Sequence, residues 1–288
     1  MKLHRSTIQL LRFHFSFFLL PVFLMALGML PSIQPTKAFL VFFILHFLVY
    51  PASNGYNSYM DRDTESIGGV ANPLLPTKQL FYVTIILDVL SVLLSCFIST
   101  VFSVGILFYI LISRAYSYRG IRLKKYPYIG YITVIFFQGF FTFGLVYYSC
   151  GNTLTWNIPM LPAIASSLLI GGFYPLTQIY QHESDKKDGV ITISYILGYR
   201  GNFIFCGFVY SIAMLLLSQY YINQHTIWKF FLFITMGLPV VFFFLSWAKK
   251  VWHNFSAANF NHTMKMNLIA SCCTNLAFLI LLIVKYFE

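Results

Sequence analysis

Long apolar runs separated by short polar segments dominate this chain of 288 residues. A run of about 20 apolar residues is enough for an α-helix to span a bilayer. Nine segments meet or approach that length, at residues 14–33, 38–57, 79–98, 100–113, 128–149, 158–180, 201–222, 228–248 and 266–284. The pattern therefore predicts an all-α integral membrane protein with nine transmembrane helices in one polytopic domain, residues 1–288.

Residues 79–112 form one uninterrupted apolar run, which could be one helix or two. A single helix of that length would be about 51 Å long, against a hydrocarbon core of about 30 Å. Ser99 and Thr100 offer a place for a tight turn. Two helices also leave the basic residues between 114 and 125 on the cytoplasmic side, where short basic loops belong. With nine helices and a cytoplasmic N-terminus, 16 of the 19 Lys and Arg residues lie inside.

Composition supports the membrane assignment, because 58% of the residues are hydrophobic and only 9% are charged. Soluble proteins carry about 25% charged residues. The net charge of +11 comes from basic residues in short loops, which indicates membrane topology and not nucleic acid as a partner. The N-terminus is basic and then apolar, as in a signal peptide. It lacks a small-residue cleavage site, so we expect a retained first helix.

Acidic residues gather at two predicted helix ends, and the first group follows the second apolar run. Asn57, Asp61 and Glu65 are spaced i, i+4, i+8, so on a helix they would share one face. Carboxylate and amide oxygens are the ligands that Mg²⁺ prefers in proteins. Asp63 lies in the same segment, and the spacing does not decide whether it also contacts the metal.

The second acidic group follows the sixth apolar run and ends at Gly189. Gln181 and Asp185 form its i, i+4 pair, and each lies 124 residues after its counterpart, Asn57 or Asp61. This offset corresponds to four helices and suggests a weak repeat of about 1–125 and 126–250, followed by a ninth helix. Glu183 and Asp188 are further candidates for contact with metal.

Both acidic groups are expected on the cytoplasmic face, where three loops also supply cations. These cations are Arg114, Arg119, Arg122, Lys124, Lys125, Lys186, Lys187 and Arg200. Carboxylates, a divalent metal and basic side chains on one face are suited to a diphosphate. The apolar interior beneath them would suit a lipid tail.

At these residues the sequence resembles the UbiA-type membrane prenyltransferases, whose motifs read N-D-x-x-D-x-x-x-D and D-x-x-x-D before Gly. Here the first motif keeps Asn57 and Asp61, with Ser58 at its second position and Glu65 at its last. The second keeps Asp185 and has Gln181 in place of the first Asp. The resemblance covers nearly the whole chain. The segment from 114 to 125 is similar to the family's Tyr- and Lys-bearing loop.

The resemblance implies a central cavity in which an isoprenyl group passes from its diphosphate, through an allylic cation, to an aromatic or lipid acceptor. Asp61 and Asp185 would be the catalytic Mg²⁺ ligands, supported by Asn57, Glu65 and Gln181. The diphosphate-binding residues would be Tyr116, Arg119, Arg122, Lys124, Lys125 and Lys186. The expected setting is the cytoplasmic membrane of a prokaryote, among membrane lipids and without an obligate protein partner.

One alternative function and one open question about Asp88 remain at this stage. A cation-coupled secondary transporter could also use the acidic groups, although transporter sites usually lie near the bilayer midplane. Asp88 lies within the third apolar run, where a carboxylate is costly and is by default functional. It could instead be a partner in an interhelical hydrogen bond.

Overall fold

The computed structural model describes residues 3–152 and 157–288. Helices make up almost all of this part of the chain, which contains no strands beyond two isolated bridges. The α-helices are α1 (Arg5–Leu11), α2 (Leu20–Met29), α3 (Pro35–Phe43), α4 (Tyr50–Asp61), α5 (Lys78–Ser95), α6 (Thr100–Ser117), α7 (Pro127–Ile135), α8 (Thr142–Cys150), α9 (Met160–Gly171), α10 (Tyr174–Gln178), α11 (His182–Lys187), α12 (Ile193–Asn223), α13 (Ile227–His253) and α14 (Phe260–Phe287). The remaining turns are the 3₁₀ segments η1 (Phe13–Phe18), η3 (Leu123–Lys125) and η5 (Phe255–Ala257), and the π-helical segments η2 (Ile44–Val49) and η4 (Phe136–Phe141).

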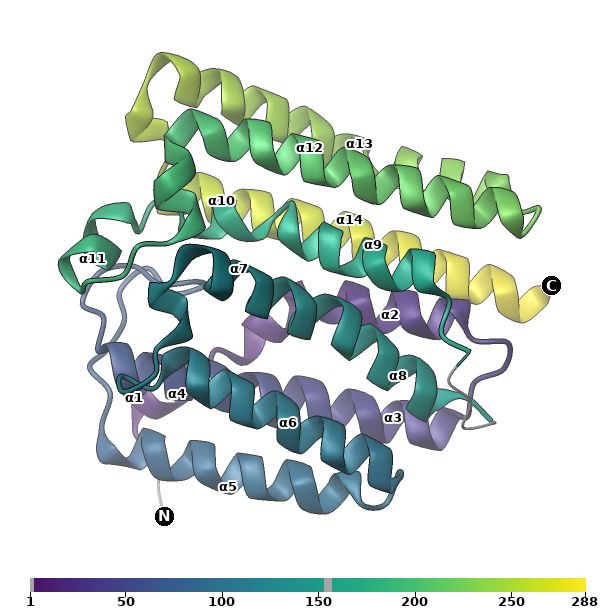
Figure 1. Ribbon diagram of the computed structural model, residues 1–288, viewed down its shortest axis with the longest axis horizontal. Coiled ribbons are helices and arrows are strands. Elements are labelled where there is room, and N and C mark those ends of the chain that lie inside the picture. Colours follow the sequence, from purple (N-terminus) through teal and green to yellow (C-terminus); the bar gives the residue numbers. More distant parts are fainter. Residues whose placement is uncertain (1–2, 153–156) are drawn as a thin grey trace.

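Among the described residues, nine helical spans are long and apolar enough to cross a membrane, as the sequence predicts. Several combine shorter elements: α1 to α2 form the first span, α3 to α4 the second, α7 to α8 the fifth and α9 to α10 the sixth. The protein is therefore a multi-pass membrane protein. The spans lie side by side, with the two chain ends at opposite ends of the bundle (Figure 1).

The predicted break between the third and fourth spans is confirmed. Helix α5 ends at Ser95 and α6 begins at Thr100. The Ser99 side chain caps α6, because its hydroxyl oxygen accepts a hydrogen bond from the Phe102 backbone N–H at 3.1 Å. This bond satisfies one of the amides that a helix N-terminus leaves without an intrahelical partner.

A π-helical turn in the fifth span shapes the interior of the bundle. Ser167 of α9 packs against this turn; its hydroxyl donates to the Ile135 carbonyl at 2.7 Å and accepts from the Phe140 N–H at 2.9 Å. These bonds satisfy backbone groups that the irregular turn leaves free. A side chain at Gly139 would come within 2.3 Å of the Ser167 Cα, so only glycine permits this close approach. Such turns often occur at functional sites.

Helix α12 contains a sharp bend at Gly198, whose φ of 65° suits glycine. Asn202 stabilises the bend, since its side-chain N–H₂ donates to the carbonyls of Ser194 at 2.8 Å and Gly198 at 2.7 Å. The first turn of α12 is thereby directed toward the loop that carries the second acidic group. Both acidic groups lie at the same end of the bundle, near α11 and the end of α4 (Figure 1).

Candidate active site

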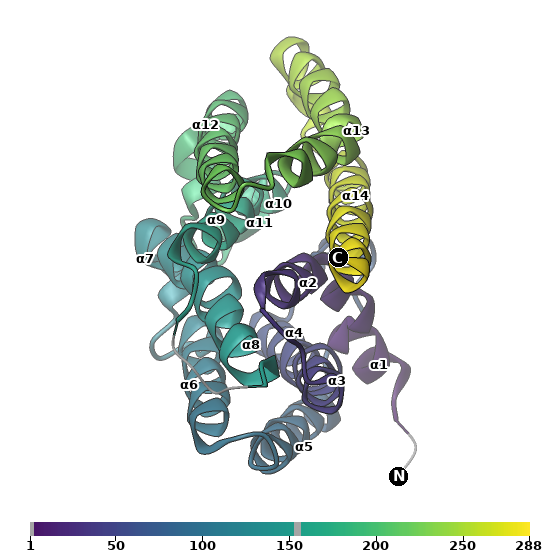
Figure 2. The same cartoon turned by 90° about the vertical axis from the view of Figure 1, so that its right-hand side faces the viewer.

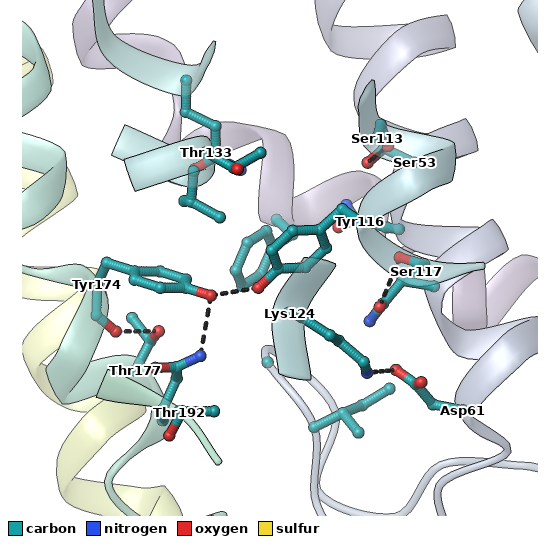
Figure 3. Close-up of a pocket in the computed structure, with 18 of the residues that line it drawn as sticks. Ser53, Asp61, Ser113, Tyr116, Ser117, Lys124, Thr133, Tyr174, Thr177 and Thr192 are labelled. Carbon is teal, nitrogen blue, oxygen red and sulfur yellow. Dashed lines mark hydrogen bonds and ion pairs between the residues drawn. The ribbon is translucent and has the colours of Figure 1, made fainter. Parts of the chain in front are cut away.

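A cavity of about 200 Å³ opens at this end of the bundle. Its wall is built from α4, α6, α7 and α10, with the 63–68 and 181–192 loops around the mouth. Figure 3 shows its side chains converging from these elements. The cavity extends along helix α6, on which the lining residue Tyr109 lies eight residues, or about 12 Å, further from the mouth than Ser117.

The first acidic group reaches the cavity through Asn57, Asp61 and Asp63, all of which line it. Asn57 is held in place by the Ser117 hydroxyl, which donates to its Oδ1 at 2.9 Å. The expectation that Glu65 continues the same helical face is wrong, because α4 ends at Asp61. Glu65 is instead exposed, with its carboxylate 3.7 Å from the Lys187 ammonium.

The second acidic group contributes Gln181 and Asp185 to the same cavity. Gln181 precedes α11, and its carbonyl accepts from the Asp185 N–H at 2.9 Å. Its side-chain N–H₂ donates to the Ser66 carbonyl at 3.2 Å, which ties the two acidic segments together. Glu183 points to solvent on the exposed side of α11 and does not line the cavity.

Three cations of the 119–124 segment bridge the two groups. Lys124 forms an ion pair with the Asp61 carboxylate, as Figure 3 shows. Arg122 pairs with Asp188 and lies 3.5 Å from Asp61. Arg119 lies 3.4 Å from Asp188 and donates to the Met60 carbonyl at 2.8 Å.

Lys125 and Lys186, the other two predicted diphosphate-binding cations, lie apart from these ion pairs, and like Arg119 and Arg122 they do not line the cavity. Lys125 is exposed and sits 4.8 Å from the centroid of the Tyr126 ring. Lys186 is exposed beside Tyr195, at 5.5 Å. Among the cavity-lining residues of the described chain, the cationic side chains are Lys124 and Arg12.

Asp63 and Asp185 are partly buried close to other carboxylates, and the pKa of each is raised. Burial, followed by the neighbouring Asp61 carboxylate, raises the pKa of Asp63 to about 6. Burial, partly offset by Lys124, raises the pKa of Asp185 to about 7, and Asp63 and Asp61 add to the rise. Groups whose pKa is raised this way prefer a proton or a cation nearby.

These residues fit a Mg²⁺ ion. One Asp61 oxygen, Oδ1, is buried and accepts no hydrogen bond. The surrounding donors are carboxylate and amide oxygens from Asn57, Asp63, Gln181 and Asp185. In residues 3–152 and 157–288 no three acidic, His or Cys side chains form a ready-made metal cluster. The carboxylate and amide oxygens around Asp61 suit Mg²⁺, which usually takes one or two carboxylates and completes its shell with substrate phosphate and water.

The inner wall is made of tyrosine, amide and aromatic side chains. The hydroxyls of Tyr116 and Tyr174 hydrogen-bond to each other, and Gln178 donates to the Tyr174 hydroxyl at 2.9 Å (Figure 3). Deeper in, Phe137 of the π-helical turn packs edge-on against Tyr109, with ring centroids 6.2 Å apart. Nothing in the sequence pattern identifies Tyr174 or Gln178 as part of the site.

Arg12 is a cation of the cavity that the sequence pattern does not identify as a site residue. It is only 6% exposed and lines the mouth, where it donates to the carbonyls of Gly68 at 3.2 Å and Asn54 at 3.1 Å. In the sequence, its position beside an apolar run is that of an ordinary topology signal. The available clue was a charge at the edge of a membrane span, which is costly unless it has a role.

Asp88 lies outside this cavity and forms an ion pair with Arg114 of the neighbouring helix α6. The Arg114 guanidinium also covers the face of Tyr56, 4.0 Å from the ring centroid. The contacts of Asp88 are therefore those of an interhelical ion pair.

Comparison with known proteins identifies the family. The model of the UbiA prenyltransferase family matches residues 17–269. The chain belongs to the UbiA prenyltransferase family. This confirms the resemblance inferred from the motifs and favours the transferase over the transporter.

One relative, the 1,4-dihydroxy-2-naphthoate octaprenyltransferase of Haemophilus influenzae, is 27% identical over 212 residues, or 67% of this chain and 68% of the relative. Solved structures share the fold. A UbiA homologue from Archaeoglobus fulgidus bound to DMAPP and Mg²⁺ has a TM-score of 0.68 at 19% identity, with 97% of this chain and 99% of that one covered. A UbiA homologue from Aeropyrum pernix K1 has a TM-score of 0.69 at 14% identity, with 93% and 98% covered.

Proposed function

We propose that this prenyltransferase transfers an isoprenyl group from its diphosphate to an aromatic or lipid acceptor within the bundle, in a Mg²⁺-dependent reaction. The observation that carries the proposal is the meeting of Asp61, Asp63 and Asp185 with Lys124 and Arg12 at one cavity mouth. An archaeal homologue of the same fold is bound to GPP and Mg²⁺, and the Haemophilus relative is named for prenylation of a naphthoate.

Asp61 and Asp185 would be the principal metal ligands, with Asn57, Asp63 and Gln181 available to complete the shell directly or through water. Bound there, Mg²⁺ would neutralise charge that develops on the leaving diphosphate. Lys124 and Arg12 would bind the remaining phosphate oxygens, and Arg119 and Arg122 would fix the position of the loop at the mouth by pairing with Asp188. Glu65 does not line the cavity and is paired with Lys187, so we assign it no part in the metal shell.

The chemistry would begin when the C–O bond to the diphosphate breaks and its electron pair leaves with the diphosphate. The allylic cation that remains would lie against the aromatic faces of Tyr109 and Phe137, which attract positive charge. The Tyr116–Tyr174–Gln178 network would orient the acceptor through its hydroxyl and amide groups. The acceptor's nucleophilic atom then forms the new C–C or C–O bond and releases a proton.

The test is prenyl transfer by the full chain in vesicles, with geranyl, farnesyl and geranylgeranyl diphosphates against hydroxybenzoate, dihydroxynaphthoate and glycerol-phosphate lipid acceptors. Asp61→Ala and Asp185→Ala should each lower turnover by roughly a hundredfold or more. Glu183→Gln is the matched control, because it removes a carboxylate from the exposed side of α11. Wild-type turnover that does not depend on Mg²⁺, or equal activities of Asp185→Ala and Glu183→Gln, would refute the proposal.

A further inference from the structure

A second hollow of about 260 Å³ lies between α12 and α13 and shares no lining residue with the catalytic cavity. Leu176, Cys206 and Met266 are buried in its floor. Val241 and Leu245 form its rim and are 47% and 58% exposed, so the hollow opens sideways. Figure 2 shows α12 and α13 standing apart at this edge of the bundle.

The setting of this groove determines what can fill it. The two helices that form its rim are membrane spans, and its lining is almost entirely apolar apart from Tyr210 and Ser211. Water gains too few hydrogen bonds there to be stable, and an empty hollow forfeits dispersion contacts along its walls. The material that a bilayer supplies at this depth is the acyl chain of a lipid.

Cations stand at the end of the groove nearest the active-site face. Lys249 follows Leu245 by one helical turn on α13, which places it about 6 Å further along the axis. Lys265 directly precedes Met266 on α14, and its ammonium lies 5.5 Å from the Phe243 ring centroid. Arg200 lies two turns before Gly207 on α12, and its guanidinium donates to the Trp252 carbonyl of α13 at 2.8 Å.

These cations lack acidic partners. Residues 189–287 contain no Asp or Glu, and within the described chain Arg200, Lys249 and Lys265 form no ion pair. The cations of the catalytic mouth differ, since Arg122 and Lys124 are both paired with carboxylates. The groove therefore ends in unneutralised positive charge at the membrane surface.

We propose that this groove is a binding site for an anionic phospholipid, with one acyl chain between α12 and α13 and the phosphate among Lys249, Lys265 and Arg200. Charge complementarity selects the headgroup, because each cation near a membrane surface favours an anionic lipid by roughly fivefold. The apolar hollow selects an occupant with a hydrocarbon chain. The site is independent of the catalytic reaction.

The proposal can be tested by native mass spectrometry of the full-length protein released from nanodiscs that contain phosphatidylglycerol and phosphatidylcholine with identical acyl chains. Lys249→Gln/Lys265→Gln removes two headgroup contacts. Its charge-matched control is Arg5→Gln/Lys78→Gln, at exposed positions in the first and third spans.

A second pair of variants tests the acyl-chain contact without changing charge. A Cβ at Gly207 would meet only the Phe244 ring, at 3.9 Å, so the side chain of Gly207→Leu has room to project into the groove and take space from an acyl chain. Gly237→Leu, on α13 outside the groove, has no atom within 4 Å of its Cβ and is the control.

The preference for bound phosphatidylglycerol should fall roughly 25-fold in the double lysine variant. Gly207→Leu should lose the bound lipid, and both controls should resemble wild type. The proposal is overturned if the charge-matched control shows an equal loss, if Gly207→Leu retains the lipid, or if Gly207→Leu abolishes a dimer, which would mean that a second copy of the chain fills the groove.

Discussion

Replacing Asp185 with Asn should abolish prenyl transfer and yet stabilise the metal-free protein at neutral and alkaline pH. The reason is the crowding at the mouth, where burial and the neighbouring carboxylates of Asp63 and Asp61 raise the pKa of Asp185 to about 7 from an ordinary value of 3.8. Asn keeps nearly the same shape and cannot ionise. The variant therefore removes the repulsion together with the proposed metal ligand.

The size and sign of the effect follow from the two pKa values. Because the folded-state pKa of Asp185 is raised, its stabilising contribution is full below pH 3.8 and is lost as the pH rises through 7. The whole loss amounts to about 4 kcal/mol of unfolding free energy. About half of this loss falls between about pH 5.5 and pH 8.

The assay is thermal unfolding of the purified protein with a chelator at both pH values. The Tm advantage of Asp185→Asn over wild type should grow by about 4–8 °C between pH 5.5 and pH 8. Added Mg²⁺ should raise the wild-type Tm at pH 8 and leave the variant unchanged, since a ligand stabilises only the state that binds it. The electrostatic account of the site fails if Asp185→Asn lowers the Tm equally at both pH values, or if Glu183→Gln behaves like it.

Three further predictions address the ion pair, the cavity floor and the topology. Asp88→Leu should destabilise the protein by about 3–5 kcal/mol because it leaves Arg114 unpaired, whereas Asp88→Leu/Arg114→Met should come close to wild type in chemical unfolding; equal losses would show that the pair is not coupled. Phe137→Leu should raise kcat/KM for geranylgeranyl over geranyl diphosphate by roughly tenfold if Phe137 limits the depth of the cavity, and an unchanged ratio would contradict that role. Single cysteines at Arg62 and Lys186 in a cysteine-free background should label from the same side of the membrane, and labelling from opposite sides would exclude a shared site.

The sequence predicts the membrane spans well because their signal is long and collective. Even the closely spaced third and fourth spans are separated correctly, since a polar residue, Ser99, caps the second of them. The first and last residues of the spans are less predictable. Helix α12 begins at Ile193 and not near 201, because Asn202 and Gly198 let the helix bend through a polar segment that hydropathy assigns to a loop.

Within the site, helical spacing predicts only residues that stay on a helix. Asn57 and Asp61 meet that condition and line the cavity, whereas Glu65 does not, because the backbone enters the left-handed region at Arg62, with φ of 55°. Asp63 then occupies the mouth. Arg12 could not be distinguished from the other N-terminal charges, since its contacts with Gly68 and Asn54 exist only after the chain folds back.

Charge balance at the mouth explains why metal and diphosphate should bind together. Four carboxylates (Asp61, Asp63, Asp185 and Asp188) meet four cations (Arg12, Arg119, Arg122 and Lys124) there. A diphosphate alone would add roughly three negative charges beside carboxylates that already resist ionisation. A metal ion alone would compete with Lys124 and Arg122 for Asp61. With both bound, Lys124 would be free to pair with a phosphate oxygen and Asp61 would be free to hold the metal, so every charge would keep an opposite neighbour.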